Sequence, residues 1–199
     1  MSDQATHDRG ATAQRILVDA AALFRRLGYE RTTTREISEA LGIRKASLYH
    51  HVSSKEDLLY EICLAALRDV EVGAQEAVAA AGDDPQDRLR AMVHGHTLAM
   101  LANVNFSHTM LTDMRSLSGE RLQQVVALRD RYETWAEGLI AAGQKAGVVK
   151  SKHSAKQLTL GLFNMLNWTM FWYRADGDLT PDEVAELLGG IYFDGVFTG

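Results

Sequence analysis

A short stretch of the chain combines cations, hydroxyls, imidazoles and a phenol at a spacing that suits nucleic-acid recognition. It covers residues 33–59 and reads as two short helices that meet at Gly42, followed by the start of a third helix. The second short helix is too small and too polar to form a core. It presents Arg44, Lys45, Ser47, Tyr49, His50 and His51 outward. Because a helix-turn-helix with such a face suits the DNA major groove, sequence-specific DNA binding is the leading hypothesis.

Two kinds of DNA contact are expected from this stretch. The candidates for contacts to base edges are Arg44, Lys45, Ser47 and His50, and an arginine can pair with guanine through two hydrogen bonds. The candidates for phosphate contacts are Thr33, Thr34, Tyr49 and Lys55, and Arg35 completes the predicted DNA-binding set. Helix N-termini favour phosphate because their N–H groups and the helix dipole both attract an anion. Taken singly, these residues also fit helix caps and solvated charges, but the whole array favours DNA contact.

The helical spacing of apolar residues predicts the helices that hold residues 33–59 in place. Capping boxes are predicted at Thr33 with Glu36 and at Ser53 with Glu56. Pro85 suits the first position of a helix. Helices are expected at 12–28, 34–41, 45–51, 53–80, 85–102, 106–115, 120–146, 154–174 and 180–197. Since strand alternation and repeats are missing from the sequence, the chain is predicted to be all-α.

The sequence predicts three parts. Residues 1–11 form a flexible arm, residues 12–55 a three-helix helix-turn-helix DNA-binding domain, and residues 56–199 a larger helical domain for ligand binding and dimerisation. Residues 1–55 hold nine Lys or Arg and six Asp or Glu, whereas the remainder holds twelve and twenty. A basic N-terminal segment followed by an acidic remainder suits a protein that contacts phosphates only through its N-terminal part.

Several function classes are disfavoured by the sequence. Cys63 is the single cysteine, so it forms no intrachain disulfide. His94 and His96 are two residues apart and would diverge on a helix, so no metal site is expected. No nucleophile elbow or paired carboxylates appear, so we predict no catalytic residues, no cofactor and no enzyme. The apolar run from Leu158 to Tyr173 is too short and too polar to span a membrane, and no secretory signal is visible. A cytoplasmic location is therefore expected.

With the helices placed, residues 12–62 resemble the DNA-binding domain of the TetR family of bacterial transcriptional repressors. The matching residues are Ile16, Ala20, Phe24, Gly28, Tyr29, Thr33, Thr34, Ile37, Ala40, Gly42, Ile43, Leu48, Tyr49, His50, His51, Lys55, Glu56 and Leu58. Val52 stands where the family usually has an aromatic residue, which should affect packing more than DNA contacts. The resemblance implies a homodimer that binds a palindromic operator and releases it when a ligand enters the C-terminal body.

A second, shorter resemblance lies near the C-terminus. Residues 167–183 resemble a TetR subgroup that governs fatty-acid, phenylacetate or sterol-fragment degradation and responds to acyl-CoA thioesters. Trp168, Trp172 and Arg174 match that stretch. The helix that carries them is apolar on nearly every face, so it should be buried on two sides. In a TetR-like body, one side would line a pocket and the other would meet the partner subunit.

The predicted effector pocket combines apolar walls with positive charge. Its walls are Met92, His96, Met100, Phe106, Met110, Trp168 and Trp172, and its cation is Arg174, with Arg115 and Arg121 as further candidates. The same apolar residues also fit a plain hydrophobic core. A four-helix dimer interface is predicted from the last two helices, through Leu158, Leu162, Leu166, Leu187, Leu188, Ile191 and Tyr192.

The leading functional hypothesis is a ligand-responsive repressor. Its predicted partners are a double-stranded DNA operator, a second copy of the chain and a largely apolar effector such as an acyl-CoA. One alternative is a small-molecule binding protein whose helix-turn-helix is only structural. An activator on the same fold is another alternative, because groove contacts do not determine the sign of regulation.

Overall fold

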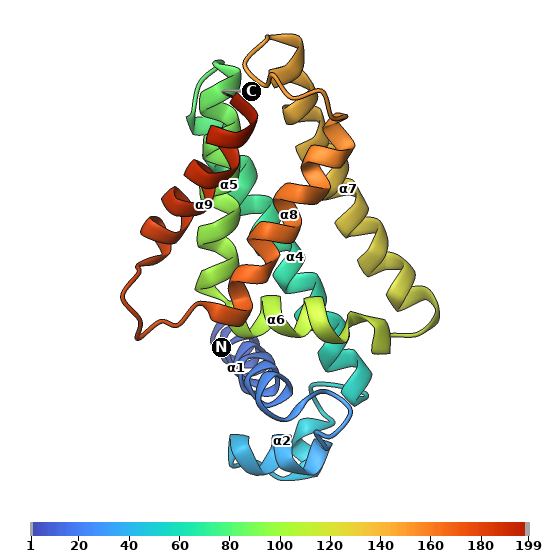
Figure 1. Ribbon diagram of the computed structural model, residues 1–199. Helices are drawn as coiled ribbons and strands as arrows, with labels where there is room; N and C mark the ends of the chain where they lie inside the picture. The colour runs from blue at the N-terminus through green and yellow to red at the C-terminus, as the bar shows by residue number, and fades with distance from the viewer. Residues whose placement is uncertain (1, 198–199) are drawn as a thin grey trace. The chain divides into compact units, whose positions relative to one another are not determined.

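The structure is a computed structural model that describes the backbone of residues 2–197 and the side chains of residues 12–194. Every regular element in that part of the chain is a helix (Figure 1). In chain order the elements are α1 (Ser2–Leu27), α2 (Thr34–Leu41), α3 (Lys45–Leu48), α4 (Lys55–Ala80), α5 (Pro85–Ala102), α6 (Val104–Asp113), the 3-10 helix η1 (Met114–Ser116), α7 (Gly119–Lys145), α8 (Ala155–Trp172) and α9 (Pro181–Phe197). The predicted all-α fold is confirmed.

Two helices differ in extent from the prediction. α1 begins at Ser2 rather than at Thr12, so its backbone includes most of the predicted arm, residues 1–11, whose side chains lie outside those described. α3 ends at Leu48 rather than at His51. The chain turns directly after Leu48, where the backbone N–H groups of the next residues bond to carbonyls three or four residues back. The short α3 therefore carries fewer residues than expected.

Most helix starts follow the predicted caps. Thr33 forms the expected capping box with Glu36, and the Thr180 hydroxyl likewise accepts from the Glu183 amide. The predicted cap of α4 is wrong by one residue. The Ser54 hydroxyl, not that of Ser53, accepts from a first-turn amide, which is that of Asp57. A capping hydroxyl accepts from an amide two or three residues further on, so the cap moves from Ser53 to Ser54 when the bonded amide is that of Asp57 rather than Glu56.

The chain divides into two compact units. Unit 1 comprises Met1–Ala66 and Asn105–Val125, and unit 2 comprises Leu67–Val104 and Val126–Gly199. The helix-turn-helix therefore shares its unit with α6, η1 and the first turns of α7, whereas the sequence prediction ended the DNA-binding domain at residue 55. α4 and α7 each contribute to both units.

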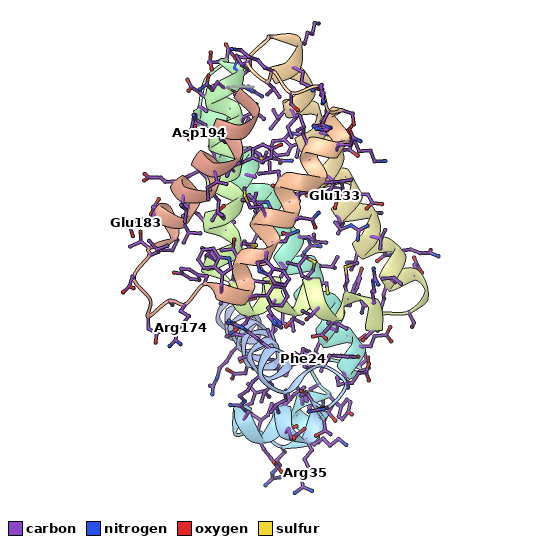
Figure 2. The ribbon with its side chains drawn as sticks, in the orientation of Figure 1. Phe24, Arg35, Glu133, Arg174, Glu183 and Asp194 are labelled. Carbon is purple, nitrogen blue, oxygen red and sulfur yellow. The ribbon has the colours of Figure 1, made fainter. Side chains whose placement is uncertain are left out.

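Unit 1 is built around the apolar face of α1. Ile16, Ala20 and Phe24 are buried there, and the Phe24 ring meets the buried Tyr29 ring edge-on with centroids 5.1 Å apart. α1 packs against α2, and α2 packs against α3. Figure 2 labels Phe24 on α1. This core holds the helix-turn-helix in place.

Unit 2 has a core formed by α5, α8 and α9 together with parts of α4 and α7. α5 packs along α9, and both contact α8. α4 and α5 approach very closely at Gly73 and Gly95, because a Cβ on Gly95 would lie only 2.4 Å from the Gly73 carbonyl oxygen. No helix among the described residues is long and apolar enough to cross a membrane.

Candidate DNA-binding surface and effector site

The turn between α2 and α3 is set by Gly42. This residue has φ 66° and ψ 25°, a left-handed conformation that favours glycine. The Gly42 amide bonds to the carbonyls at the end of α2, and the Ile43 amide bonds to the Ser38 carbonyl at 3.0 Å. Such a C-terminal cap ends α2 and redirects the chain into α3.

The short helix α3 has one buried anchor and an exposed polar face. Leu48 is fully buried, so it fixes the helix against unit 1. The predicted base-contacting side chains Arg44, Lys45 and His50 are exposed, and Ser47 is half-exposed. A cationic and hydroxyl-bearing face on a single turn, with its apolar residue turned inward, is suited to hydrogen-bond with base edges.

Tyr49 is linked to both helices of the motif. Its hydroxyl lies 3.4 Å from the Thr34 hydroxyl at the start of α2. The Lys45 ammonium lies 5.8 Å from the centre of the Tyr49 ring. The exposed Tyr49 ring therefore has a hydroxyl and a cation beside it, which is an arrangement suited to a phosphate oxygen.

Two of the predicted DNA-binding residues are engaged within α2. The Thr33 hydroxyl accepts from the Glu36 amide and also donates to the Glu36 carboxylate at 2.8 Å. The Thr33 amide, at 2.7 Å, and the Thr33 hydroxyl both donate to the Glu36 carboxylate, which lowers the pKa of Glu36 and keeps a negative charge at the start of α2. Arg35 pairs with Glu39 at 2.7 Å and lies at the edge of unit 1 (Figure 2). A phosphate at this helix start would have to compete with Glu36.

Lys55 is also committed within unit 1. Its ammonium donates to the Tyr29 carbonyl at 2.9 Å and lies 4.1 Å from the centre of the Tyr29 ring. Burial, with a smaller contribution from Glu56, raises the pKa of Tyr29 to about 12. Lys55 therefore fastens the turn after α1 to the start of α4. A phosphate contact by Lys55 stays a prediction.

The residues predicted to form the effector pocket fall into three groups. Met92, His96 and Met100 lie on α5 and are buried in unit 2. Phe106 and Met110 lie on α6 and are buried in unit 1. The remaining three, at the end of α8 and just beyond it, are exposed. The first group shares one helix, whereas the α6 pair belongs to the other unit, and the eight-residue contact set stays a prediction.

The aromatic end of α8 faces solvent. Trp168 is 63% exposed and Trp172 is 41% exposed. The Trp168 ring meets that of Phe171 with centroids 4.5 Å apart. Arg174 pairs with Asp176 through two hydrogen bonds. Because burial of one side of α8 was expected from a partner subunit, that burial stays a prediction.

A ligand-sized cavity lies elsewhere in unit 2. It measures about 480 Å³, a volume within the range of small-molecule sites, and is open to solvent. α4, α5 and α9 line it with Ala77, Ala80, Ala81, Arg90, Ala91, His94, Ala185, Glu186, Gly189 and Phe193. None of the eight predicted effector residues is among these described lining residues.

Comparison with known proteins identifies the family. Residues 16–62 match the family model for "Bacterial regulatory proteins, tetR family", and residues 82–196 match that for "Tetracyclin repressor-like, C-terminal domain". The chain belongs to the TetR family of bacterial transcriptional regulators. The resemblance of residues 12–62 to that family is thus confirmed, and the helix-turn-helix is that of a DNA-binding transcription regulator.

Individual TetR-family relatives match along nearly the whole chain. The HTH-type transcriptional repressor KstR2 of Rhodococcus jostii is 30% identical over 193 residues, which is 96% of this chain and 94% of the relative. The crystal structure of PfmR from Thermus thermophilus has a TM-score of 0.83 and 36% identity, covering 90% of this chain and 97% of that one. AibR, solved in complex with isovaleryl coenzyme A and operator DNA, has a TM-score of 0.81 and 27% identity, covering 91% and 97%.

A polar network at the start of α4 was not foreseen from the sequence. Glu56 accepts from the amide and hydroxyl of Ser118, which lower its pKa, and Asp57 pairs with Arg121. Tyr60 donates its hydroxyl to Gln124 one turn further along. The partners are more than sixty residues apart in the chain. No local pattern predicts such pairs, and Arg121 had instead been considered for the effector pocket.

Proposed function

We propose that this TetR-family protein is a repressor that binds a palindromic operator as a homodimer and releases it when it binds an acyl-CoA. The observation that carries the proposal is the exposed polar face of α3, held by the buried Leu48 and the left-handed Gly42. The proposal also includes a cytoplasmic location, where the chromosome is accessible, and a binding function without catalysis.

DNA binding is supported by the exposure of Arg44, Lys45, Tyr49 and His50, which lie on the short helix α3 and directly beside it. The test is selection of operator sequences from a random DNA pool, followed by gel-shift titration at two salt concentrations. A regulator should select a palindrome, and its affinity should fall steeply with salt as phosphate contacts are lost. Equal, weak binding to all sequences would favour the alternative of a ligand-binding protein with a structural helix-turn-helix.

Dimer formation is supported by exposed apolar residues on the last two helices. These are Leu160, Trp168 and Phe171 on α8, and Leu187 and Ile191 on α9. The interface predicted from the sequence needs correction, because Leu158, Leu162, Leu166 and Leu188 are buried in the core of their own chain. Exposed apolar patches on soluble proteins commonly mark interaction surfaces. The proposed interface is therefore a neighbouring face of α8 and α9.

Sedimentation equilibrium tests the dimer and its interface. The wild-type protein should sediment at twice the 22.0 kDa chain mass. Ile191→Glu, at a position 59% exposed, should yield a monomer because it places a charge in an apolar contact. The control Val72→Glu changes a residue on α4 that is comparably exposed, and it should stay dimeric. A monomeric wild-type protein, or a dimeric Ile191→Glu, would contradict this interface.

The acyl-CoA class is supported by relatives and by residues of this chain. AibR was solved with an acyl-CoA and operator DNA, and Trp168, Trp172 and Arg174 match the acyl-CoA-responsive subgroup in sequence. In the structure, the buried α5 residues Met92, His96 and Met100 offer the apolar environment that an acyl group requires. The proposed contact set keeps all eight predicted residues, which are these six together with Phe106 and Met110.

To release the operator, the effector must bind the DNA-incompetent state of the protein more tightly than the DNA-binding state. A ligand shifts an equilibrium between two states only through its unequal affinity for them. A panel of short, medium, long and ring-bearing acyl-CoAs should therefore contain a compound that weakens the operator complex. Free coenzyme A should not weaken it. The readouts are the melting temperature and the operator gel shift. A panel in which no compound changes either readout would contradict the acyl-CoA proposal and leave DNA binding to be judged separately.

A further inference from the structure

A buried histidine in unit 2 is held in one orientation by residues from two other helices. His96 on α5 is 4% exposed. Its ring stacks on Phe163 of α8 with centroids 5.3 Å apart and on Tyr132 of α7 with centroids 5.8 Å apart. Its Nδ1 lies 2.9 Å from the Tyr132 hydroxyl. The two stacks and the hydrogen bond together fix both the plane and the rotation of the ring.

The partners of His96 also determine where its proton lies. Burial lowers the pKa of His96 to about 4, opposed by the nearby Asn167 side chain, so the ring is neutral near pH 7. Burial raises the pKa of Tyr132, so its hydroxyl keeps its proton and needs an acceptor. Donation from that hydroxyl to Nδ1 satisfies both groups. Because a neutral imidazole carries one N–H, the ring proton then lies on Nε2.

The Nε2 atom is buried and has no hydrogen-bond partner among the described residues. Most buried polar groups in proteins are hydrogen-bonded, and an unpaired one calls for a bound molecule or another explanation. The half-buried Asn167 side chain on α8 lies near enough to favour the protonated ring as a hydrogen-bonding group would, but its geometry gives Nε2 no well-formed hydrogen bond. Tyr132 also stacks on the half-buried Trp135 at 5.6 Å, which extends the aromatic surface.

We propose that the Nε2–H of His96 donates a hydrogen bond to the thioester carbonyl oxygen of the effector, while the acyl group packs on the rings of Tyr132 and Phe163. This inference rests on the proposed acyl-CoA function and assigns the specificity-determining residue of that site. A neutral donor among aromatic rings suits a neutral acceptor, because burying a carboxylate or phosphate here would leave its charge unpaired. The coenzyme A phosphates would remain on the solvent side, beyond Asn167.

The test compares two compounds that differ at the carbonyl. Octanoyl-CoA contains a thioester carbonyl, whereas S-octyl-coenzyme A has a CH₂ group in its place and keeps nearly the same length and charge. Binding is measured by calorimetry and by the shift in melting temperature. Wild-type protein should bind octanoyl-CoA roughly tenfold more tightly, in line with one net hydrogen bond in a buried site. In His96→Phe, which keeps a flat ring but has no donor, the two compounds should bind equally.

Two further variants separate this role from a purely structural one. His94→Phe changes a half-exposed histidine on the same helix, which pairs with Asp182 at 3.0 Å, and should keep the tenfold preference. Tyr132→Phe removes the hydroxyl that orients the ring, so the preference should shrink while the fold is kept. Imidazole ¹⁵N spectra of wild-type protein, compared with His96→Phe, should assign to His96 a neutral ring with its proton on Nε2.

Three outcomes would overturn the proposal. They are equal binding of the two compounds by wild-type protein, a preference that survives in His96→Phe, and a proton on Nδ1 in the spectra. If wild-type protein binds the two compounds equally and His96→Phe lowers the stability, only a bound water satisfies Nε2. Failure of the whole acyl-CoA panel to bind would overturn this inference together with the acyl-CoA proposal, whereas binding without a preference for the carbonyl overturns this inference alone. Operator titration without any effector tests DNA binding independently, so a failure there is recognised separately.

Discussion

The α3 face in unit 1 and several positions on α5, α8 and α9 in unit 2 place polar and apolar side chains in opposite ways. In unit 1, the α3 face exposes its cations and hydroxyls, and its apolar residue Leu48 is buried. In unit 2, the polar His96 and Thr169 are buried, whereas the apolar Trp168 and Ile191 are exposed. Burying a polar side chain and exposing a large apolar one both cost free energy in a chain that has no ligand or partner. Such exceptions are expected where a ligand or a partner subunit supplies the missing contacts.

The contrast has a consequence for mutation. A side chain on the α3 face can be removed without repacking a core, so its loss should affect binding and leave stability unchanged. A change inside unit 2 alters close packing, so it should affect stability first. Four expected effects of substitution would break or sharpen this contrast.

The largest effect is expected at the crossing of α4 and α5. Gly95→Ala should destabilise the fold by about 3 kcal/mol, because the new Cβ would meet the Gly73 carbonyl oxygen at 2.4 Å and backbone would have to move. The matched control is Gly138→Ala on α7, where a Cβ would meet nothing within 4 Å. That change should stabilise the helix by about 0.5–1 kcal/mol. Urea unfolding of both variants measures the difference, and similar stabilities would contradict the tight crossing.

The second effect concerns the buried imidazole and pH. The pKa of His96 is lowered to about 4 in the fold, whereas an unfolded histidine titrates near 6.5. As pH falls below about 6.5, the unfolded chain takes up a proton that the folded chain does not, so stability is lost progressively down to about pH 4. The loss amounts to roughly 3 kcal/mol. His96→Phe should remove this part of the pH dependence.

Denaturant midpoints of wild-type and His96→Phe protein between pH 7 and pH 4.5 check this effect. The comparison uses the difference between the two proteins, because carboxylates such as Glu36 and Glu56, whose pKa values are lowered, also titrate at acid pH. The half-exposed His94 serves as the control, through His94→Phe. Parallel curves for His96→Phe and wild type would mean that folding does not lower the pKa of His96.

The third effect should appear in DNA binding alone. Arg44→Ala is expected to relax sequence preference at a cost of about 1–3 kcal/mol in operator affinity, as a base-edge contact requires, with an unchanged melting temperature. Lys55→Ala should behave differently, because Lys55 binds the Tyr29 carbonyl inside unit 1. It should lower the melting temperature as well as the affinity. Gel shifts at two salt concentrations measure the operator affinity, and thermal unfolding measures the melting temperature. A lower melting temperature in Arg44→Ala, or an unchanged one in Lys55→Ala, would contradict the prediction.

The smallest effect is expected at the start of α2. Thr33→Ala removes the cap that accepts from the Glu36 amide and should cost about 1 kcal/mol of stability. Thr34→Ala, one residue further on, removes a hydroxyl 3.4 Å from that of Tyr49 and should leave stability nearly unchanged. Thermal unfolding ranks the two variants. An equal loss in both would show that the Thr33 cap contributes nothing special.

The outcome of the sequence predictions differs between the two units. The positions of α2 and α3, the Gly42 turn and the Thr33 cap agree with prediction because each depends on residues a few positions apart. The start of α1 and the end of α3 were wrong, since neither is marked by a strong cap or breaker. For the effector site, the pattern identified apolar residues on α5 and α8. It did not reveal that those on α5 are buried and that Trp168 and Trp172 are exposed.

The sequence by itself determined the all-α class, most helix boundaries and the outward polar face of α3. Helical period and capping act within one or two turns, so the chain carries them locally. The tertiary structure decided which faces are covered. The pairing of His96 with Tyr132 joins residues 36 apart, and that of Glu56 with Ser118 joins residues 62 apart. A helical period assigns a side chain to a face, but only the packing of distant helices determines what that face meets.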